Sequence, residues 1–176
     1  MAELASELDF ALSLADTADA VTLPRFNARN FTVDIKANST EVTEVDRETE
    51  TTIMDVIRAQ RPHHAWYGEE HGSGGTDISE YTWVIDPIDG TSNFVRGVPV
   101  WATLIGLVHR DVGPVLGVVS APAFLSSAST ASLIPFSFPK DSAKASRLGV
   151  SSNAFLASAC CFLTSSSKLK ARCALC

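Results

Sequence analysis

Two aspartates separated by two residues are the strongest candidates for chemistry in this sequence. They lie in the run Asp86-Pro87-Ile88-Asp89, and Asp followed by Pro is typical of a type I turn, whose ends lie within about 7 Å. We therefore expect the two carboxylates to converge. Close carboxylates repel unless a proton or cation lies between them, and such hard oxygen ligands suit Mg²⁺, Mn²⁺ or Ca²⁺. The alternative is a solvent-exposed turn with two ordinary aspartates.

The residues that follow favour phosphate chemistry beside the metal. Gly90-Thr91-Ser92-Asn93 supplies a glycine and three small polar residues that could open a short helix. Free N–H groups at the start of a helix favour a phosphate oxygen. Adjacent metal and phosphate sites indicate phosphoryl chemistry rather than calcium storage, and the residue pattern of an EF-hand loop is absent.

Strands are expected to precede the acidic motifs. Ala65–Tyr67 is predicted to be a short strand that ends in Gly68-Glu69-Glu70, and Tyr81–Ile85 a buried strand that stops at Asp86. Ligands usually bind at the carboxyl ends of strands in open α/β sheets. Residues 101–108 and 115–119 are predicted to form a β-hairpin.

Two helices are expected before these strands. Residues 3–20 show helical periodicity, and Pro24 would discourage continuation. Thr43 is predicted to cap a second helix, with Glu44 and Asp46 in its first turn and Pro62 at its close. A half-buried strand is predicted between them at 31–35. The apolar face of the first helix is expected to consist of Leu4, Leu8, Ala11, Leu12 and Ala15.

Composition narrows the class of protein. The 176 residues, 45% hydrophobic and 19% charged, suit one compact domain or a fragment of a larger one. A net charge of −6 argues against a general nucleic-acid binder. We expect a cytoplasmic protein, because the acidic start lacks the pattern of a secretory signal and the uncharged residues 112–139 contain too many prolines for a membrane helix.

The order of three motifs resembles that of a known family. Thr43-x-x-Asp46 comes first, Gly68-Glu69-Glu70 second, and the block from Trp83 to Phe94 third. Together they resemble the signature of the inositol monophosphatase family of Mg²⁺-dependent phosphomonoesterases. Residues 94–105, with Ser120-Ala-Pro122, are most similar to the histidinol-phosphatase branch. The resemblance covers residues 3 to about 122.

The resemblance implies a role for each residue of the motifs. Glu69, Asp86, Asp89 and the carbonyl group of Ile88 would bind metal, with Asp86 bridging two ions. Thr91 and Asp46 would orient the attacking water and, with Glu69, form the catalytic set. The backbone N–H groups around Gly90, Thr91 and Ser92 would hold the phosphate, and Glu69, Ile88 and Asp89 would also face the substrate. The implied cofactor is Mg²⁺, with Mn²⁺ as the alternative ion.

The implied fold is α+β, the N-terminal part of a layered α-β-α-β-α sandwich. Residues 1–122 would form this region with its metal site, and residues 123–176 a divergent Ser/Ala-rich, Cys-containing tail. The family's later Trp-Asp motif is not found, since no Trp follows Trp101 and no Asp follows Asp141. We therefore expect the second half of the sandwich to be missing, through truncation, a frameshift or a faulty gene model.

The expected function is hydrolysis of a small phosphate monoester, L-histidinol phosphate to L-histidinol, in histidine biosynthesis. Inositol 1-monophosphate is the alternative substrate, and an inactive cation-binding remnant that pairs with a full-length homologue is the alternative of another class. We expect a small phosphorylated metabolite as partner, neither nucleic acid nor a membrane, and leave a homodimer open. Two interpretations of Lys36 stay open: it reaches the site, or it is a solvated charge at the end of a strand.

Overall fold

The computed structural model describes residues 2–76, 78–125, 132–133 and 171–175. Its elements, in chain order, are α1 (Ala2–Ala28), β1 (Val33–Ile35), β2 (Glu41–Thr43), α2 (Glu44–Gln60), β3 (Ala65–Gly68), β4 (Gly72–Gly74), β5 (Tyr81–Asp89), α3 (Thr91–Arg96), β6 (Ala102–His109), β7 (Gly113–Ser120), α4 (Pro122–Leu125), β8 (Ser132–Leu133) and β9 (Ala171–Leu175). Among the described residues, no helix combines the length and the apolar character needed to cross a bilayer.

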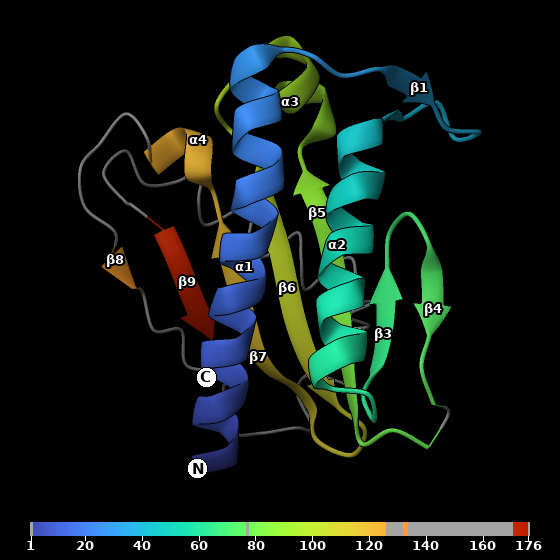
Figure 1. Ribbon diagram of the computed structural model, residues 1–176, viewed down its shortest axis with the longest axis vertical. Coiled ribbons are helices and arrows are strands. Elements are labelled where there is room, and N and C mark those ends of the chain that lie inside the picture. Colours follow the sequence, from blue (N-terminus) through green and yellow to red (C-terminus); the bar gives the residue numbers. More distant parts are fainter. Residues whose placement is uncertain (1, 77, 126–131, 134–170, 176) are drawn as a thin grey trace, which may run out of the picture.

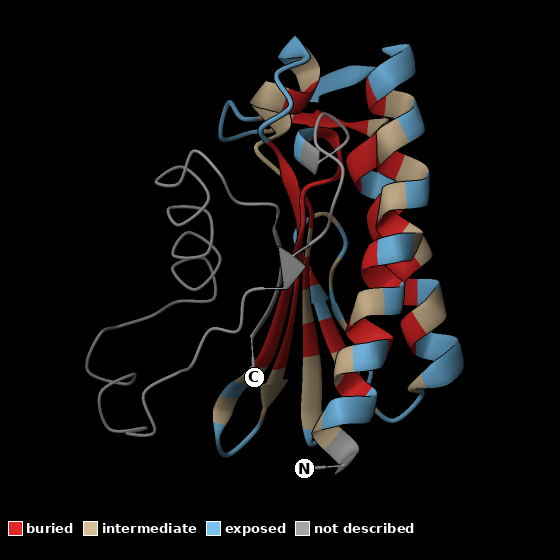
Figure 2. Cartoon of the chain, turned by 90° about the vertical axis from the view of Figure 1, so that its left-hand side faces the viewer, coloured by how far each residue is buried: buried red, intermediate tan, exposed pale blue. Residues whose placement is uncertain are grey.

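Helices α1 and α2 lie side by side on one face of a mixed sheet (Figures 1 and 2). The order of the strands is β4-β3-β5-β6-β7-β9-β8. The main core lies between these helices and the sheet, and its largest fully buried side chains include Trp83, Ile85 and Leu107. The predicted α+β class is confirmed, with a helical layer covering one face of a sheet.

Helix α1 continues past the predicted stop at Pro24 to Ala28. A proline inside a helix removes one backbone hydrogen bond. The last turn is nevertheless held by packing, because Phe26 is buried against the rings of Phe94 and Trp101, at centroid distances of 5.4 Å in both cases. Tertiary contacts thus outweigh the local signal, and the predicted end of the helix is wrong.

The buried face of α1 is also rotated from the predicted one. Leu8 and Leu12 are only partly buried, whereas Phe10 and Leu14 are buried together with the alanines of that stripe. Small alanine side chains let the helix approach the sheet closely, so the face is set by Ala11, Ala15 and Ala18 more than by the leucines.

The predicted cap of α2 is confirmed in full. The Thr43 side chain accepts hydrogen bonds from the backbone of Val45 and Asp46, and the Asp46 side chain accepts one from the Thr43 backbone. This reciprocal arrangement satisfies donors that a helix start otherwise leaves unpaired. It also fixes the Asp46 carboxylate at the first turn of the helix.

The first predicted strand is shorter than expected and solvent-exposed. Strand β1 pairs only with β2, in a two-stranded ribbon that lies apart from the main sheet (Figure 1). Ile35 is 65% exposed. The predicted half-buried strand is therefore wrong in its burial over Val33–Ile35, whereas Phe31, which precedes β1, packs against Phe94 at a ring-centroid distance of 5.0 Å.

The remaining predicted strands are present. β3 and β5 run parallel, and β5, β6 and β7 pair antiparallel in succession. The predicted hairpin is β6–β7, which closes with His109 opposite Gly113. Strand β9 adds to β7 and β8 to β9, although no strand was predicted in either range. The rest of the predicted tail, residues 126–131, 134–170 and 176, lies outside the described residues.

Candidate active site at the ends of two parallel strands

The acidic motifs meet at the carboxyl ends of β3 and β5. These neighbouring strands are parallel, with Gly68 opposite Ile85, so the residues that follow them emerge at the same edge of the sheet. The Glu69 N–H continues the pairing by donating to the carbonyl oxygen of Ile85 at 3.2 Å. Glu69 and Asp86 therefore lie beside each other, although 17 positions separate them in the chain.

A cavity of about 470 Å³ opens at this edge of the sheet. The predicted site residues that line it are Glu69, Asp86, Ile88, Asp89, Gly90, Thr91 and Ser92. The lining residues that sequence reasoning missed are Asn38, Thr40, Glu41, Tyr67, Val84 and Ile85. No local signal could have found Asn38 and Thr40, because only the folded position of the β1–β2 connection brings them to the strand ends.

The run from Asp86 to Asp89 is part of β5, so the predicted type I turn is wrong. Asp86 pairs with Leu104 and Asp89 with Ala102, which leaves one extra residue on the β5 side. Such a bulge bends the strand and disrupts its pairing locally. Pro87 accounts for the position, since it lacks an N–H for the ladder, and its carbonyl oxygen instead accepts a hydrogen bond from Thr103 Oγ1 at 2.8 Å.

The bulge achieves the convergence that the turn was expected to give. In a regular strand, residues three apart point to opposite faces of the sheet. The extra residue shifts this alternation by one, and both Asp86 and Asp89 line the cavity. The expected nearness of the two aspartates thus holds, for a different structural reason.

Asp86 is the electrostatically strained member of the site. Its Oδ1 atom is buried and has no hydrogen-bond partner among the residues that the structure describes. Burial, together with the negative charges of Glu69 and Asp89, raises the pKa of Asp86 from 3.8 to about 9. Removing a carboxylate from water while placing others beside it disfavours ionisation unless a cation compensates.

The donor set of the cavity fits a hard divalent cation. Glu69, Asp86 and Asp89 offer carboxylate oxygens and Ile88 a carbonyl group, and all four residues line the same space. The unpartnered Asp86 Oδ1 is the acceptor that such an ion would satisfy. Within the described part of the chain, no three acidic, histidine or cysteine side chains are already gathered as a complete cage.

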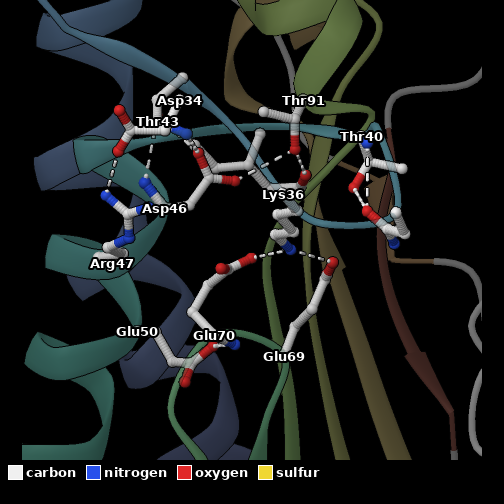
Figure 3. Close-up of polar contacts among 12 residues, drawn as sticks. Asp34, Lys36, Thr40, Thr43, Asp46, Arg47, Glu50, Glu69, Glu70 and Thr91 are labelled. Carbon is white, nitrogen blue, oxygen red and sulfur yellow. Dashed lines mark hydrogen bonds and ion pairs between the residues drawn. The ribbon is translucent and has the colours of Figure 1, made fainter.

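The structure brings Thr91, at the start of α3, within hydrogen-bond distance of Asp46, at the start of α2 (Figure 3), although Asp46 is buried and is not among the residues that line the cavity. Thr91 Oγ1 lies 3.1 Å from Asp46 Oδ1 and 3.0 Å from the carbonyl oxygen of Ile88. The other carboxylate oxygen of Asp46 accepts from Thr43 Oγ1 at 2.6 Å. Burial raises the pKa of Asp46, and the hydrogen bonds from Thr43 and Thr91 oppose that rise.

Gly90 turns the chain from β5 into α3. Its φ of 88° lies in the left-handed region, which a residue with a side chain adopts at a cost. The Gly90 carbonyl oxygen accepts from the backbone of Asn93 and Phe94, at 2.8 and 3.1 Å. Thr91 and Ser92 are consequently held at the mouth of the cavity in the first turn of the predicted short helix.

Lys36 reaches the site, so of its two interpretations, a site residue or a solvated charge, the contacts favour the first. Its ammonium group donates to Glu69 Oε1 at 2.9 Å and also to Glu70 Oε1 (Figure 3). Burial acts to lower the pKa of Lys36, but the hydrogen bonds and charges of Glu70 and Glu69 outweigh it and raise the pKa overall. Burial also raises the pKa of Glu70, against the opposing effect of Lys36.

The family model described as "Inositol monophosphatase family" matches residues 3–170 of this chain. Histidinol-phosphatase from Mycobacterium tuberculosis is 49% identical over 117 residues, which are 66% of this chain and 44% of that protein. Histidinol-phosphatase from Streptomyces coelicolor is 48% identical over 126 residues, or 70% of this chain and 47% of that protein. The chain thus spans less than half the length of these curated relatives.

The fold is shared with solved structures of the same kind. An IMPase from Thermotoga maritima superposes with a TM-score of 0.59 at 35% sequence identity. The alignment covers 68% of this chain and 45% of that one. This agrees with the expectation that the described residues form the N-terminal part of the layered fold.

Proposed function

Because this chain belongs to the inositol monophosphatase family, we propose that it provides the metal- and phosphate-binding part of a Mg²⁺-dependent phosphomonoesterase site. The proposed reaction is hydrolysis of L-histidinol phosphate to L-histidinol and inorganic phosphate, in histidine biosynthesis. The observation that carries the proposal is the buried, unpartnered Oδ1 of Asp86, in a cavity that Glu69 and Asp89 also line. The similarity to two histidinol-phosphatases supports the choice of substrate.

The proposed metal ligands are Glu69, Asp86, Asp89 and the Ile88 carbonyl oxygen. When bound, Mg²⁺ ions would lower the pKa of a coordinated water and offset the negative charge on the phosphoryl group. Mn²⁺, which prefers the same oxygen ligands, is the alternative ion. The Ile88 carbonyl oxygen has two lone pairs, so it can serve a cation although Thr91 Oγ1 lies 3.0 Å from it.

We assign Thr91 and Asp46 to orienting the attacking water. The Thr91 hydroxyl carries one hydrogen, and donation to Asp46 Oδ1 leaves its lone pairs able to accept a hydrogen bond from water. Asp46 is held in place from its other oxygen by Thr43. Its carboxylate can therefore fix the direction of the hydroxyl without itself moving.

The phosphate is proposed to lie against the start of α3. The first N–H groups of a helix have no partner within the helix, and Gly90, Thr91 and Ser92, at the start of α3, line the cavity. On this proposal residues 1–122 form the catalytic region, and residues 123–176 remain a divergent tail without an assigned role. A cytoplasmic location and a homodimer stay proposals of the sequence alone.

A phosphate-release assay on the folded chain tests the proposal. L-Histidinol phosphate and inositol 1-phosphate are supplied in parallel, with Mg²⁺ and with a chelator. We expect Mg²⁺-dependent release from L-histidinol phosphate that Asp86→Asn abolishes and Asp55→Asn retains. Asp55 provides the matched control because it is an exposed aspartate, on α2, whose ion pair with Arg58 lies outside the cavity.

The other outcomes discriminate the alternatives. Faster release from inositol 1-phosphate would replace the proposed substrate and keep the reaction. Uptake of Mg²⁺ by the wild-type chain in calorimetry, without release from either ester, would leave a cation-binding protein without turnover. If the folded chain neither takes up Mg²⁺ nor releases phosphate from either ester, the proposal is refuted.

A further inference from the structure

Glu50 is a fully buried acidic residue that takes no part in lining the cavity. It lies on α2, one helical turn after Asp46, and faces the turn between β3 and β4. That turn consists of Glu69, Glu70 and His71. A carboxylate with no exposure to solvent needs its acceptors satisfied within the protein.

Three donors from the turn satisfy the Glu50 carboxylate. The Glu70 N–H donates to Oε2 at 2.8 Å, and the His71 N–H donates to Oε1 at 2.8 Å. The His71 ring nitrogen Nδ1 lies 3.0 Å from Oε1, where it is placed to donate as well. Two consecutive backbone groups and one side chain are thus anchored on a single carboxylate of the helix.

Gly68 provides the space that this contact requires. A Cβ atom at residue 68 would lie 2.1 Å from Glu50 Oε1 and 2.4 Å from its Cδ. Only glycine allows the carboxylate to approach the backbone at that point. Glu69, the next residue, lines the cavity and lies between the strand that ends at Gly68 and the two anchored N–H groups.

We propose that Glu50 is a positioning residue, whose carboxylate holds the backbone of the β3–β4 turn so that Glu69 stays beside Asp86 at the cavity. The inference rests on the proposed function, since it concerns the residues to which a cation would bind. Glu50 acts here through the backbone of Glu70 and His71 and touches neither the cation nor the substrate. Partners that orient metal ligands typically change metal affinity by about 10–100-fold when they are altered.

Glu50→Gln weakens these hydrogen bonds with little change in the shape of the side chain. The amide keeps one acceptor oxygen, but its NH₂ group then faces a backbone N–H, so one of the two main-chain hydrogen bonds is lost. Glu48→Gln is the matched control. Glu48 lies on the same helix, its side chain is 52% exposed, and its nearest cation is Arg25 at 3.7 Å. The control therefore removes the same charge without touching the turn.

The first measurement is a titration with Mn²⁺ alone, in which electron paramagnetic resonance measures the concentration of the free ion. It is carried out at a temperature where circular dichroism shows every variant folded. We expect binding to Glu50→Gln to weaken by about tenfold or more, and binding to Glu48→Gln to stay within about twofold of wild type. Equal affinity in folded Glu50→Gln would overturn the inference and leave the proposed function standing. A wild-type chain that binds no Mn²⁺ would overturn both.

The second measurement needs no variant. In the wild-type protein the amide hydrogens of Glu70 and His71 should exchange slowly, because hydrogen bonds to the buried Glu50 carboxylate protect them. Exchange as fast as in an exposed turn would overturn the inference. Where Glu50→Gln does not fold, Gly68→Ala replaces it, since the added methyl group displaces the same carboxylate and should weaken Mn²⁺ binding to a similar extent. Unchanged binding in folded Gly68→Ala would again contradict the positioning role.

Discussion

Asp86 should make the metal-free protein less stable as the pH rises, opposite to the usual behaviour of an aspartate. Its pKa is raised from 3.8 to about 9 in the folded chain, first by burial and then by Glu69 and Asp89. Between these two values the folded state binds one more proton than the unfolded state. The free energy of unfolding therefore decreases with pH throughout that window, and the stabilisation present below pH 3.8 is lost by about pH 9.

The size of the effect follows from the linkage relation. One extra proton bound by the folded state changes the free energy of unfolding by about 1.4 kcal/mol for each pH unit. Between pH 5 and pH 8 the contribution of Asp86 thus falls by about 4 kcal/mol. That is a large fraction of the total stability of a typical domain, about 5–15 kcal/mol.

Asp86→Asn isolates this contribution, because the amide has a similar shape and stays neutral at every pH of the experiment. Urea denaturation of the wild-type chain and the variant is followed with a chelator present. The variant should gain stability relative to wild type by about 4 kcal/mol from pH 5 to pH 8. Asp55→Asn, at an exposed aspartate on α2, should track the wild type. A difference between Asp86→Asn and wild type that stays constant with pH would refute the account of a buried, crowded carboxylate.

Adding Mg²⁺ should reverse the ranking. A cation that binds only the folded state stabilises it by an amount that grows with the ratio of its concentration to the dissociation constant. The wild type should gain stability with Mg²⁺ at neutral pH, and Asp86→Asn should not. Asp86→Asn would then stabilise the metal-free protein and at the same time abolish its stabilisation by Mg²⁺.

Three further substitutions test other parts of the structure. Thr43→Ala removes the cap of α2 and should cost about 1–2 kcal/mol in urea denaturation; a cost near zero would contradict the capping contacts. Thr91→Val keeps the shape but removes the hydroxyl beside Asp46, so phosphate release should fall by about 10²-fold or more while the fold persists, and an unchanged rate would exclude Thr91 from orienting water. Arg29→Met removes the donors to the carbonyl groups of Phe94 and Val95 at the end of α3. It should lower the free energy of unfolding by about 1–2 kcal/mol, and no loss would show that these bonds contribute nothing net.

Sequence reasoning succeeded where the determining interactions are local. The cap at Thr43 depends on residues within three positions of it, and the structure contains both of its hydrogen bonds. The β6–β7 hairpin depends on one turn between two apolar runs. The nearness of Glu69 to Asp86 was implied only by the family resemblance, and the structure accounts for it by two parallel strands that end at the same edge of the sheet.

It failed where distant packing decides between local options. Pro24 should have ended α1, but the burial of Phe26 against Phe94 and Trp101 continues the helix through it. The turn preference of Asp86-Pro87 gave way to a bulged strand, because β6 pairs on both sides of the proline and Thr103 satisfies its carbonyl group. Neither partner lies within a window that local propensities can weigh.

Glu50 and Asp86 lie near the β3–β4 turn and have the same functional group in opposite surroundings. The Glu50 carboxylate is surrounded by donors, which satisfy both of its oxygens and tie α2 to the turn after β3. Asp86 is surrounded by other carboxylates and keeps a buried oxygen without a partner. A buried carboxylate with all its acceptors satisfied rigidifies its surroundings, whereas one crowded by other carboxylates loses stability when it ionises unless a cation binds. A fold under selection for stability alone would have no reason to keep the second beside the first. The unsatisfied Asp86 carboxyl group is therefore the strongest argument that the end of β5 binds a ligand.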